Sequence, residues 1–350
     1  MQMEKHHENR GRREFLRRLG AGVLVLASPG GRLSAAQPSG SKPLRGIFVI
    51  AQTPFTESDK LDLDALAEEV KFVDRGRVHG FVWPQLASEW STLTERERLD
   101  GAEAILATGK RLRPAVVIGV QGPNAAAAVN YARHAQKLGA DAIISLPPAE
   151  SGDPKAVLEY YKEVGKATEL PLFVQAVGNM TVESLIEMYK AIPTMRYVKY
   201  EARQPLVAIG QLRRGSSDQI EVFTGGHGRT LIDEMWRGSA GTMPAASFGD
   251  LYAQVWDFWQ EGKRKEALDM WGKTATLITE LGVYSGIETL KYILYLRGVF
   301  KTYSIRRKQR QGFAEAEKVA AGGGESGGLD DTGKQLLREM LGYLKPYLRG

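Results

Sequence analysis

A lysine and a glutamate two residues apart end an apolar segment in the second half of the chain. The segment MRYVKYE covers residues 195–201 and contains Lys199 and Glu201. Residues two apart on a strand point to the same face, so we expect these side chains to lie together. An enclosed ammonium group loses hydration, which favours the neutral amine that attacks carbonyl carbons. The pattern fits either a Schiff-base lysine beside a carboxylate or a buried lysine–glutamate pair that closes one end of the fold.

The amino-acid composition argues against several other kinds of catalytic site. The chain has no cysteine, which excludes thiolate zinc sites, iron–sulfur clusters, disulfides and cysteine nucleophiles. Of its five histidines, only His227 falls near the end of an expected strand, so a metal-dependent aldolase or hydrolase would lack ligands. We interpret His227 as a satisfied polar residue. We expect no metal and no cofactor.

The N-terminal residues 1–36 resemble a twin-arginine export signal. Arg12 and Arg13 open the motif RREFLR, an apolar run covers 19–27, and the small residues SAA at 34–36 suit a cleavage site. The run is shorter than the about 20 residues that span a bilayer. We expect export to the periplasm and no stable membrane span after removal of the signal. An uncleaved anchor or a basic amphipathic helix is the alternative.

The charge of the chain gives no sign of a nucleic-acid partner. The formal net charge is +6, but residues 1–36 hold seven Lys or Arg and three Glu, which leaves +2 for the remainder. A nucleic-acid-binding domain carries a stronger and more clustered positive charge. We therefore expect a small molecule as the partner.

Short apolar runs alternate with helical stretches from about residue 45, the pattern of parallel β/α units. Strands are predicted at 46–51, 80–84, 114–120, 141–146, 171–176, 196–201, 220–224 and 238–243. Helices are predicted between them at 62–75, 95–108, 123–138, 154–168, 181–192, 204–213 and 229–237. The even spacing, with no Gly-x-Gly-x-x-Gly after the first strand, favours a closed (β/α)8 TIM barrel over a doubly wound sheet.

This pattern divides the chain into four parts. Residues 1–36 form the signal, 45–247 the barrel, 248–306 additional C-terminal helices packed on the barrel, and 307–350 a Gly-rich linker with a terminal surface helix at 334–348. Trp256, Trp259 and Trp271 lie on amphipathic faces in the third part. We interpret these tryptophans as core or subunit contacts rather than as a ligand site.

Active sites of such barrels lie at the C-terminal ends of the strands, so the polar residues there are the candidates. Lys199 and Glu201 are the candidate catalytic residues. The candidate substrate-binding residues are Thr53, Gln85, Ser88, Glu89, Gln175, Gly225, Gly226 and Thr242.

Residues 193–202, which include Lys199 and Glu201, are similar to the sixth strand of the dihydrodipicolinate synthase and N-acetylneuraminate lyase family. Further landmarks occur in the same order: TPF at 53–55, STLTER at 91–96, LGADA at 138–142 and GSAGTMP at 238–244. The resemblance covers about residues 45–300. It implies a cofactor-free enzyme in which Lys199 forms an imine with a 2-oxo acid, and a homo-oligomer, either a dimer or a tetramer.

The chain departs from that family at the residues that surround the lysine. The family's Gly-Thr-Thr-Gly-Glu becomes QLASE at 85–89, so both threonines that grip the substrate carboxylate are replaced. Ala149 stands where the family's proton-relaying tyrosine is expected, and Gln175 with Ala176 replaces a tyrosine–asparagine pair. The usual proton shuttle therefore cannot operate. Glu150 or Glu201 could act instead if the enclosed mouth favours a protonated carboxyl.

We expect a lyase, either an aldolase or a dehydratase, that acts on a sugar-acid-derived 2-oxo acid through a Schiff base at Lys199. Export and the missing residues argue against a dihydrodipicolinate synthase-like condensation, which is one alternative. The other is a diverged barrel that binds a carboxylate ligand without imine chemistry, with Lys199 as a plain cation.

Overall fold

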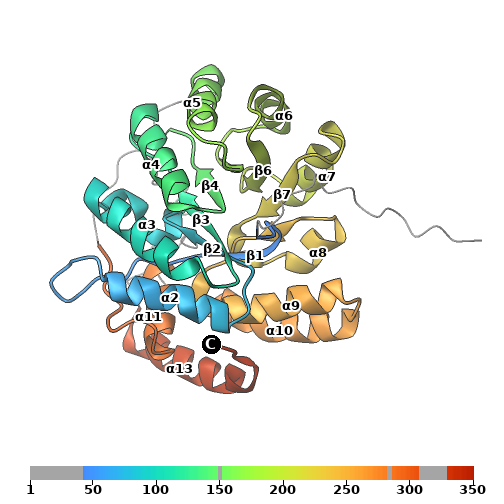
Figure 1. Ribbon diagram of the computed structural model, residues 1–350. Coiled ribbons are helices and arrows are strands. Elements are labelled where there is room, and N and C mark those ends of the chain that lie inside the picture. Colours follow the sequence, from blue (N-terminus) through green and yellow to red (C-terminus); the bar gives the residue numbers. More distant parts are fainter. Residues whose placement is uncertain (1–41, 149–151, 282–285, 307–328) are drawn as a thin grey trace, which may run out of the picture. The chain divides into compact units, whose positions relative to one another are not determined.

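Eight parallel strands close into a barrel in chain order (Figure 1). The computed structural model describes residues 42–148, 152–281, 286–306 and 329–350. Strand β1 pairs with both β2 and β8, so the sheet has no free edge. The strands are β1 Gly46–Ile50, β2 Gly80–Trp83, β3 Ala115–Gly119, β4 Ala142–Ser145, β5 Leu172–Ala176, β6 Met195–Tyr200, β7 Glu221–Thr224 and β8 Gly241–Thr242. The predicted TIM barrel is confirmed.

Helices connect successive strands and cover the outside of the barrel (Figure 1). They are α2 Leu63–Arg75, α3 Glu95–Gly109, α4 Ala125–Leu138, α5 Pro154–Lys166, α6 Val182–Ala191, α7 Pro205–Gly215 and α8 Leu231–Trp236. Thr94 and Thr181 cap the starts of α3 and α6 with their hydroxyl groups, as their sequence contexts indicate. Gly139 ends α4 with a φ of +82°, a conformation that favours glycine.

Aromatic rings fill the interior of the barrel. The rings of Phe173 and Tyr197 stack with centroids 4.3 Å apart, and Phe223 and Phe48 meet edge to face with centroids 5.1 Å apart. Tyr197 is two residues before Lys199 on β6, so both point inward. These aromatic rings thus form an apolar layer beneath Lys199.

Further helices follow β8 and lie together on one side of the barrel (Figure 1). They are α9 Gly249–Gln260, α10 Arg264–Leu281, α11 Gly286–Leu296 and α13 Asp331–Leu344. Trp256 and Trp259 are only 4% and 7% exposed, which makes them core residues of the barrel and its added helices. Helix α13 begins three residues before the predicted terminal helix and buries Leu337, Leu341 and Leu344.

Three predicted features lie outside the described residues: the export signal at 1–36, Ala149 with Glu150, and most of the Gly-rich linker. Among the helices that the structure describes, none has both the length and the apolar character needed to cross a bilayer.

Candidate active site

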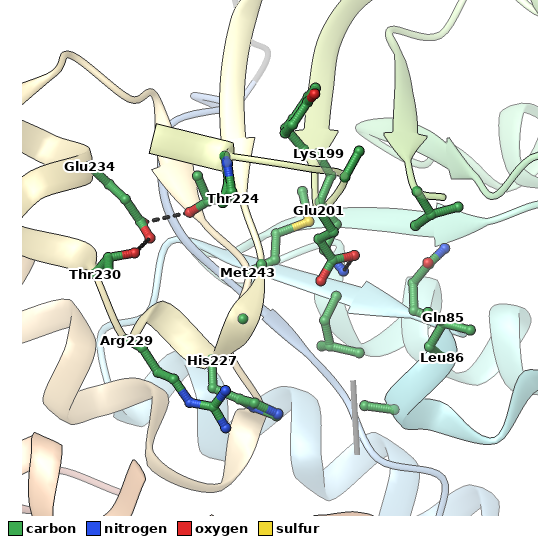
Figure 2. Close-up of a pocket in the computed structure, with 18 of the residues that line it drawn as sticks. Gln85, Leu86, Lys199, Glu201, Thr224, His227, Arg229, Thr230, Glu234 and Met243 are labelled. Carbon is green, nitrogen blue, oxygen red and sulfur yellow. Dashed lines mark hydrogen bonds and ion pairs between the residues drawn. The ribbon is translucent and has the colours of Figure 1, made fainter. Parts of the chain in front are cut away.

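A cavity of about 610 Å³ opens at the C-terminal ends of the strands, where barrel enzymes hold their substrates (Figure 2). Its size suits a small molecule. Segments after three strands form most of the wall: Gln85, Leu86 and Ala87 after β2; Lys199, Glu201 and Arg203 in and after β6; and Gly225, Gly226, His227, Arg229, Thr230 and Glu234 after β7.

Lys199 and Glu201 form an ion pair inside this cavity. Lys199 Nζ lies 3.0 Å from Glu201 Oε2, and the two side chains are 5% and 20% exposed. Gln175 Nε2 donates to the same carboxylate oxygen at 2.5 Å, from a position directly beside Lys199 in the β5–β6 register. A carboxylate this close can take the proton that an ammonium must lose before its nitrogen attacks a carbonyl.

Gly225 makes room for the Glu201 carboxylate. A Cβ atom at position 225 would lie 1.8 Å from Glu201 Oε1, far inside van der Waals contact. Gly226 follows with a φ of +67° and opens the short 3-10 helix Gly226–Gly228. These two predicted residues therefore line the cavity with backbone and leave its space to the carboxylate and to a ligand.

Gln85 is the predicted polar residue that reaches the cavity from β2. Its Nε2 donates to Gln121 Oε1 at 2.9 Å, whereas its buried Oε1 meets no donor among the described residues. Leu86 and Ala87 also line the cavity, in the places where the family resemblance puts threonines. This wall is therefore apolar apart from one amide.

Thr53 and Ser88, both predicted to bind substrate, do not line the cavity, because their hydroxyl groups form hydrogen bonds inside the protein. Thr53 Oγ1 donates to the Ser88 carbonyl at 2.5 Å and accepts a hydrogen bond from Trp83 Nε1 at 3.0 Å. Ser88 Oγ donates to the Ala51 carbonyl at 2.5 Å and accepts one from the Gln85 backbone N–H. Backbone carbonyls beyond the strand ends need donors, and these hydroxyls supply them.

Glu89 also points away from the cavity, toward the added helices. Its carboxylate pairs with Lys291 of α11 and accepts a hydrogen bond from the Arg306 backbone N–H at 2.7 Å. Lys291 is fully buried, and burial lowers the pKa of its ammonium group while Glu89 opposes that shift. The one sequence signal for this pair was a lysine within the apolar run of α11. The pair anchors the segment that carries Gln85 to Ala87.

Glu234 of α8 is a cavity residue that the sequence did not single out. It is 1% exposed, its Oε2 accepts a hydrogen bond from Thr224 Oγ1 at 2.5 Å, and its Oε1 accepts one from Thr230 Oγ1 at 2.7 Å. Burial raises the pKa of Glu234 to about 7, against the lowering effect of hydrogen bonds from Thr224, Thr230 and Thr242. Thr242 lies behind Thr224, with the two hydroxyl oxygens 2.9 Å apart.

The two carboxyl groups of the cavity lie on opposite sides of Thr224. Figure 2 shows Glu234 joined to both threonine hydroxyls on the left of Thr224, and Lys199 with Glu201 on its right. Arg229 and His227 project below them in the same view, and Arg203 lines the cavity as well. The site thus combines an amine, two differently surrounded carboxyls and cationic groups suited to an anionic ligand.

No three His, Asp or Glu side chains in the described ranges gather closely enough to hold a metal ion.

Comparisons with known proteins agree with this architecture. The chain is 28% identical over 264 residues to the L-2-keto-3-deoxyarabonate dehydratase of Azospirillum brasilense, a match that covers 73% of this chain and 85% of the relative. Its fold is similar to that of the Proteus mirabilis N-acetylneuraminate lyase, with a TM-score of 0.74, 16% identity, and coverage of 87% and 99% of the two chains. It is also similar to a dihydrodipicolinate synthase of Rhodopseudomonas palustris, with a TM-score of 0.72, 23% identity, and coverage of 85% and 97%.

The family comparison spans the barrel and reaches into the added helices. The model of the dihydrodipicolinate synthetase family matches residues 43–314, which is well over half of the sequence. The match includes every strand of the barrel, Lys199, and the segments that line the cavity. The chain therefore belongs to the dihydrodipicolinate synthetase family.

Proposed function

We propose that the protein is a lyase that forms a Schiff base between Lys199 and a 2-oxo acid derived from a sugar acid. The observation that carries this proposal is the buried Lys199 ammonium group, 3.0 Å from Glu201 in a cavity at the strand ends. Membership of the family supports a lyase. The relative named as a keto-deoxy sugar acid dehydratase supports the substrate class.

Glu201 can serve every proton transfer at nitrogen in this reaction. It takes a proton from the Lys199 ammonium, and the neutral amine adds to C2 of the oxo acid. The former carbonyl oxygen then receives two protons, the one held by Glu201 and a second that Glu201 transfers from the added nitrogen, and leaves as water. The product is a protonated imine, which keeps one positive charge beside the carboxylate. For loss of water, Glu201 can then remove a proton from C3 to give an enamine, from which the C4 hydroxyl departs. For an aldol cleavage, the base instead takes the proton of the C4 hydroxyl, the C3–C4 bond breaks, and its electron pair passes to the imine to give the enamine.

The cavity wall supports a hydroxylated anion as the substrate. Gln85 lines the cavity, and its buried Oε1 meets no donor in the described parts of the chain, so it could accept a hydrogen bond from a substrate hydroxyl once the amide turns toward the cavity. Leu86 and Ala87 carry no hydroxyl groups, so the substrate carboxylate needs another partner. Arg203 and Arg229 line the same cavity and supply positive charge for it.

Leu86 and Ala87 also favour a second candidate function, a barrel that binds a carboxylate ligand without imine chemistry. In that case the Lys199 ammonium group remains a plain cation. A third candidate is a condensation like that of dihydrodipicolinate synthase, which the same two replacements disfavour because they remove the hydroxyls expected to grip the substrate.

Borohydride trapping distinguishes imine formation from binding. The protein is incubated with pyruvate, or with L-2-keto-3-deoxyarabonate, then reduced, digested and analysed by mass spectrometry. We expect a mass increment on the Lys199 peptide alone. The peptide with Lys291, a second buried lysine that does not line the cavity, is the internal control. No increment with either acid would overturn the Schiff base, and binding retained by Lys199→Arg would then support the binding protein.

A further inference from the structure

The proposed lyase reaction needs a proton donor for the leaving oxygen, and the family's tyrosine is replaced by Ala149. Only two of the described residues that line the cavity are acids, Glu201 and Glu234. Glu201 pairs with the Lys199 ammonium and accepts a hydrogen bond from the Gln175 amide, so it is engaged at the lysine, where the proposed reaction uses it as a base. The other carboxyl, that of Glu234, lies on the opposite side of Thr224 and is the candidate donor.

We propose that Glu234 is the proton donor for the leaving oxygen, and that the hydroxyl of Thr230 carries the proton from this buried carboxyl to the substrate. The inference rests on the proposed Schiff-base function, because the leaving group departs from an enamine held at Lys199. It assigns Glu234 and Thr230 to the chemistry of the cavity, in addition to Lys199 and Glu201.

The hydrogen-bond geometry provides a continuous path. Glu234 is almost fully buried, whereas Thr230 is exposed to the cavity and its hydroxyl lies 2.7 Å from Glu234 Oε1. A hydroxyl group donates one proton and accepts another, so a proton can pass through Thr230 without movement of the carboxyl. The Thr224 hydroxyl donates a hydrogen bond to the other carboxyl oxygen of Glu234 at 2.5 Å, and the Thr242 hydroxyl oxygen lies 2.9 Å from that of Thr224. This second contact fixes the orientation of the carboxyl.

The surroundings of Glu234 suit a group that exchanges protons near neutral pH. Burial raises its pKa to about 7, and Asp233 on the same helix adds to the increase. Charged and titratable neighbours outside α8 are Arg229, just before the helix, and Tyr252 on α9. Burial raises the pKa of Tyr252, so that phenol stays neutral. Glu234 is therefore partly protonated near neutral pH, as a proton donor must be.

The elimination balances with these groups. Glu201 removes a proton from C3, and the electron pair of that C–H bond forms the enamine. The enamine electrons then move to form the C3–C4 double bond while the C4–O bond breaks. Thr230 gives its proton to the leaving oxygen and takes one from Glu234, so water departs and Glu234 is left as a carboxylate. Solvent water afterwards returns a proton from Glu201 to Glu234.

Two reactions of the same enzyme separate the two proposals. Exchange of the pyruvate methyl protons with deuterated water needs only the imine and Glu201. Dehydration of L-2-keto-3-deoxyarabonate also needs the donor. We expect Glu234→Gln to keep the borohydride adduct at Lys199 and to exchange pyruvate protons within about twofold of the wild type. Its dehydration rate should fall by about 10²-fold or more, the usual contribution of general acid catalysis.

Two further variants and a control test the path itself. Thr230→Val should lose dehydration as Glu234→Gln does, and Thr230→Ser should restore it. In the wild type the dehydration rate should fall as pH rises through about 7, because the donor must be protonated, and Glu234→Gln should lack this dependence. Glu69→Gln is the matched control: Glu69 is equally buried, has a pKa raised by burial, and does not line the cavity. It should keep the wild-type pH profile.

Each outcome is decisive. Wild-type dehydration by Glu234→Gln, with the same loss above pH 7, would overturn the donor and leave Glu234 as a structural link between α8 and the strands. A wild-type protein that forms the adduct but does not dehydrate the probe would overturn it as well. Absence of both the adduct and the proton exchange in the wild type would instead remove the proposed function, and the donor with it.

Discussion

Glu201 owes its position beside Lys199 to the absence of a side chain at residue 225. Gly225 has a φ of −118°, outside the left-handed region, and a steric requirement favours glycine here. The clashing atom would be the end of the flexible Glu201 side chain. A larger residue at 225 is therefore expected to move the carboxylate and leave the barrel intact.

Gly225→Ala should weaken the Lys199–Glu201 pair and slow imine formation. Since the added Cβ would lie 1.8 Å from Glu201 Oε1, the carboxylate must rotate away from the lysine. We expect a decrease of about tenfold or more in the rate of borohydride trapping with pyruvate, as general base assistance is lost. Gly272→Ala in α10, where a Cβ would enter open space, is the control and should trap at the wild-type rate. Equal rates for all three proteins would show that Glu201 does not assist.

Some residues of the site could be predicted from the sequence and others could not. The two-residue period of a strand sufficed to place Lys199 and Glu201 together, because both belong to one run of backbone. Glu234 could not be found this way, since it reaches the cavity from a helix through contacts with threonines on two strands. Thr53 and Ser88 were correctly placed at strand ends, but no pattern indicates that neighbouring carbonyls occupy their hydroxyls.

Among the secondary-structure elements, the segment 302–306 after the added helix α11 contacts the loops of the barrel. The Arg306 guanidinium pairs with Glu97 in the first turn of α3 at 2.7 Å and with Asp59 of the β1–α2 loop at 2.9 Å. The hydrogen bond from Arg306 lowers the pKa of Glu97 to about 2. Together with the Glu89–Lys291 pair, this contact supports the segment that forms the β2 side of the cavity.

Glu97→Gln should lower the free energy of unfolding at pH 7 by about 1 kcal/mol, the upper range for a partly exposed ion pair. A carboxyl with a lowered pKa stabilises the folded state above its unfolded pKa of 4.5, and this contribution is lost as the pH falls toward 2. The difference between wild type and variant in urea unfolding should therefore shrink over that range.

Glu95→Gln, an exposed acid in the same helical turn, is the control for that measurement and should change stability by less than about 0.5 kcal/mol. A Glu97→Gln difference that stays constant between pH 5 and pH 2 would contradict the ion pair as its source.

Most element boundaries were predicted within two residues because caps and glycines mark them locally. Strand β8 is the main exception: residues 238–243 were predicted, whereas only Gly241–Thr242 form the strand. The Ser239 hydroxyl lies 2.6 Å from the Gly241 carbonyl oxygen and 3.0 Å from that of Val222, and it accepts a hydrogen bond from the Gly241 backbone N–H at 3.1 Å. This side chain contacts backbone groups near the start of the run, beside the hydrogen bond from the Ala240 N–H to the Val222 carbonyl. Sequence periodicity does not reveal such contacts.

At the scale of the molecule, the end of the chain is built into the folded unit. The Arg297 guanidinium pairs with Asp250 at 2.8 Å, both side chains are buried, and the Arg349 backbone N–H donates to the same carboxylate at 2.7 Å. These residues are up to 99 positions apart in sequence. These contacts depend on how α9, α11 and the C-terminal residues pack against one another. The sequence pattern therefore predicted the residues of the barrel, but it did not predict the contacts of Asp250 with Arg297 and Arg349.

Residues 1–36 carry the remaining proposal at this scale, export by a twin-arginine signal. If Arg12 and Arg13 are read as a pair, then Arg12→Lys with Arg13→Lys should keep the full chain, of 38.6 kDa, in the cytoplasm of a bacterial host. The unchanged sequence should appear in the periplasm with a mass reduced by the signal. Arg17→Lys with Arg18→Lys is the control of equal charge, and it should still be exported. Both double variants keep the positive charge of the N-terminal region. If the two lose export equally, the loss does not depend on the Arg12–Arg13 pair, and this result would contradict a twin-arginine signal.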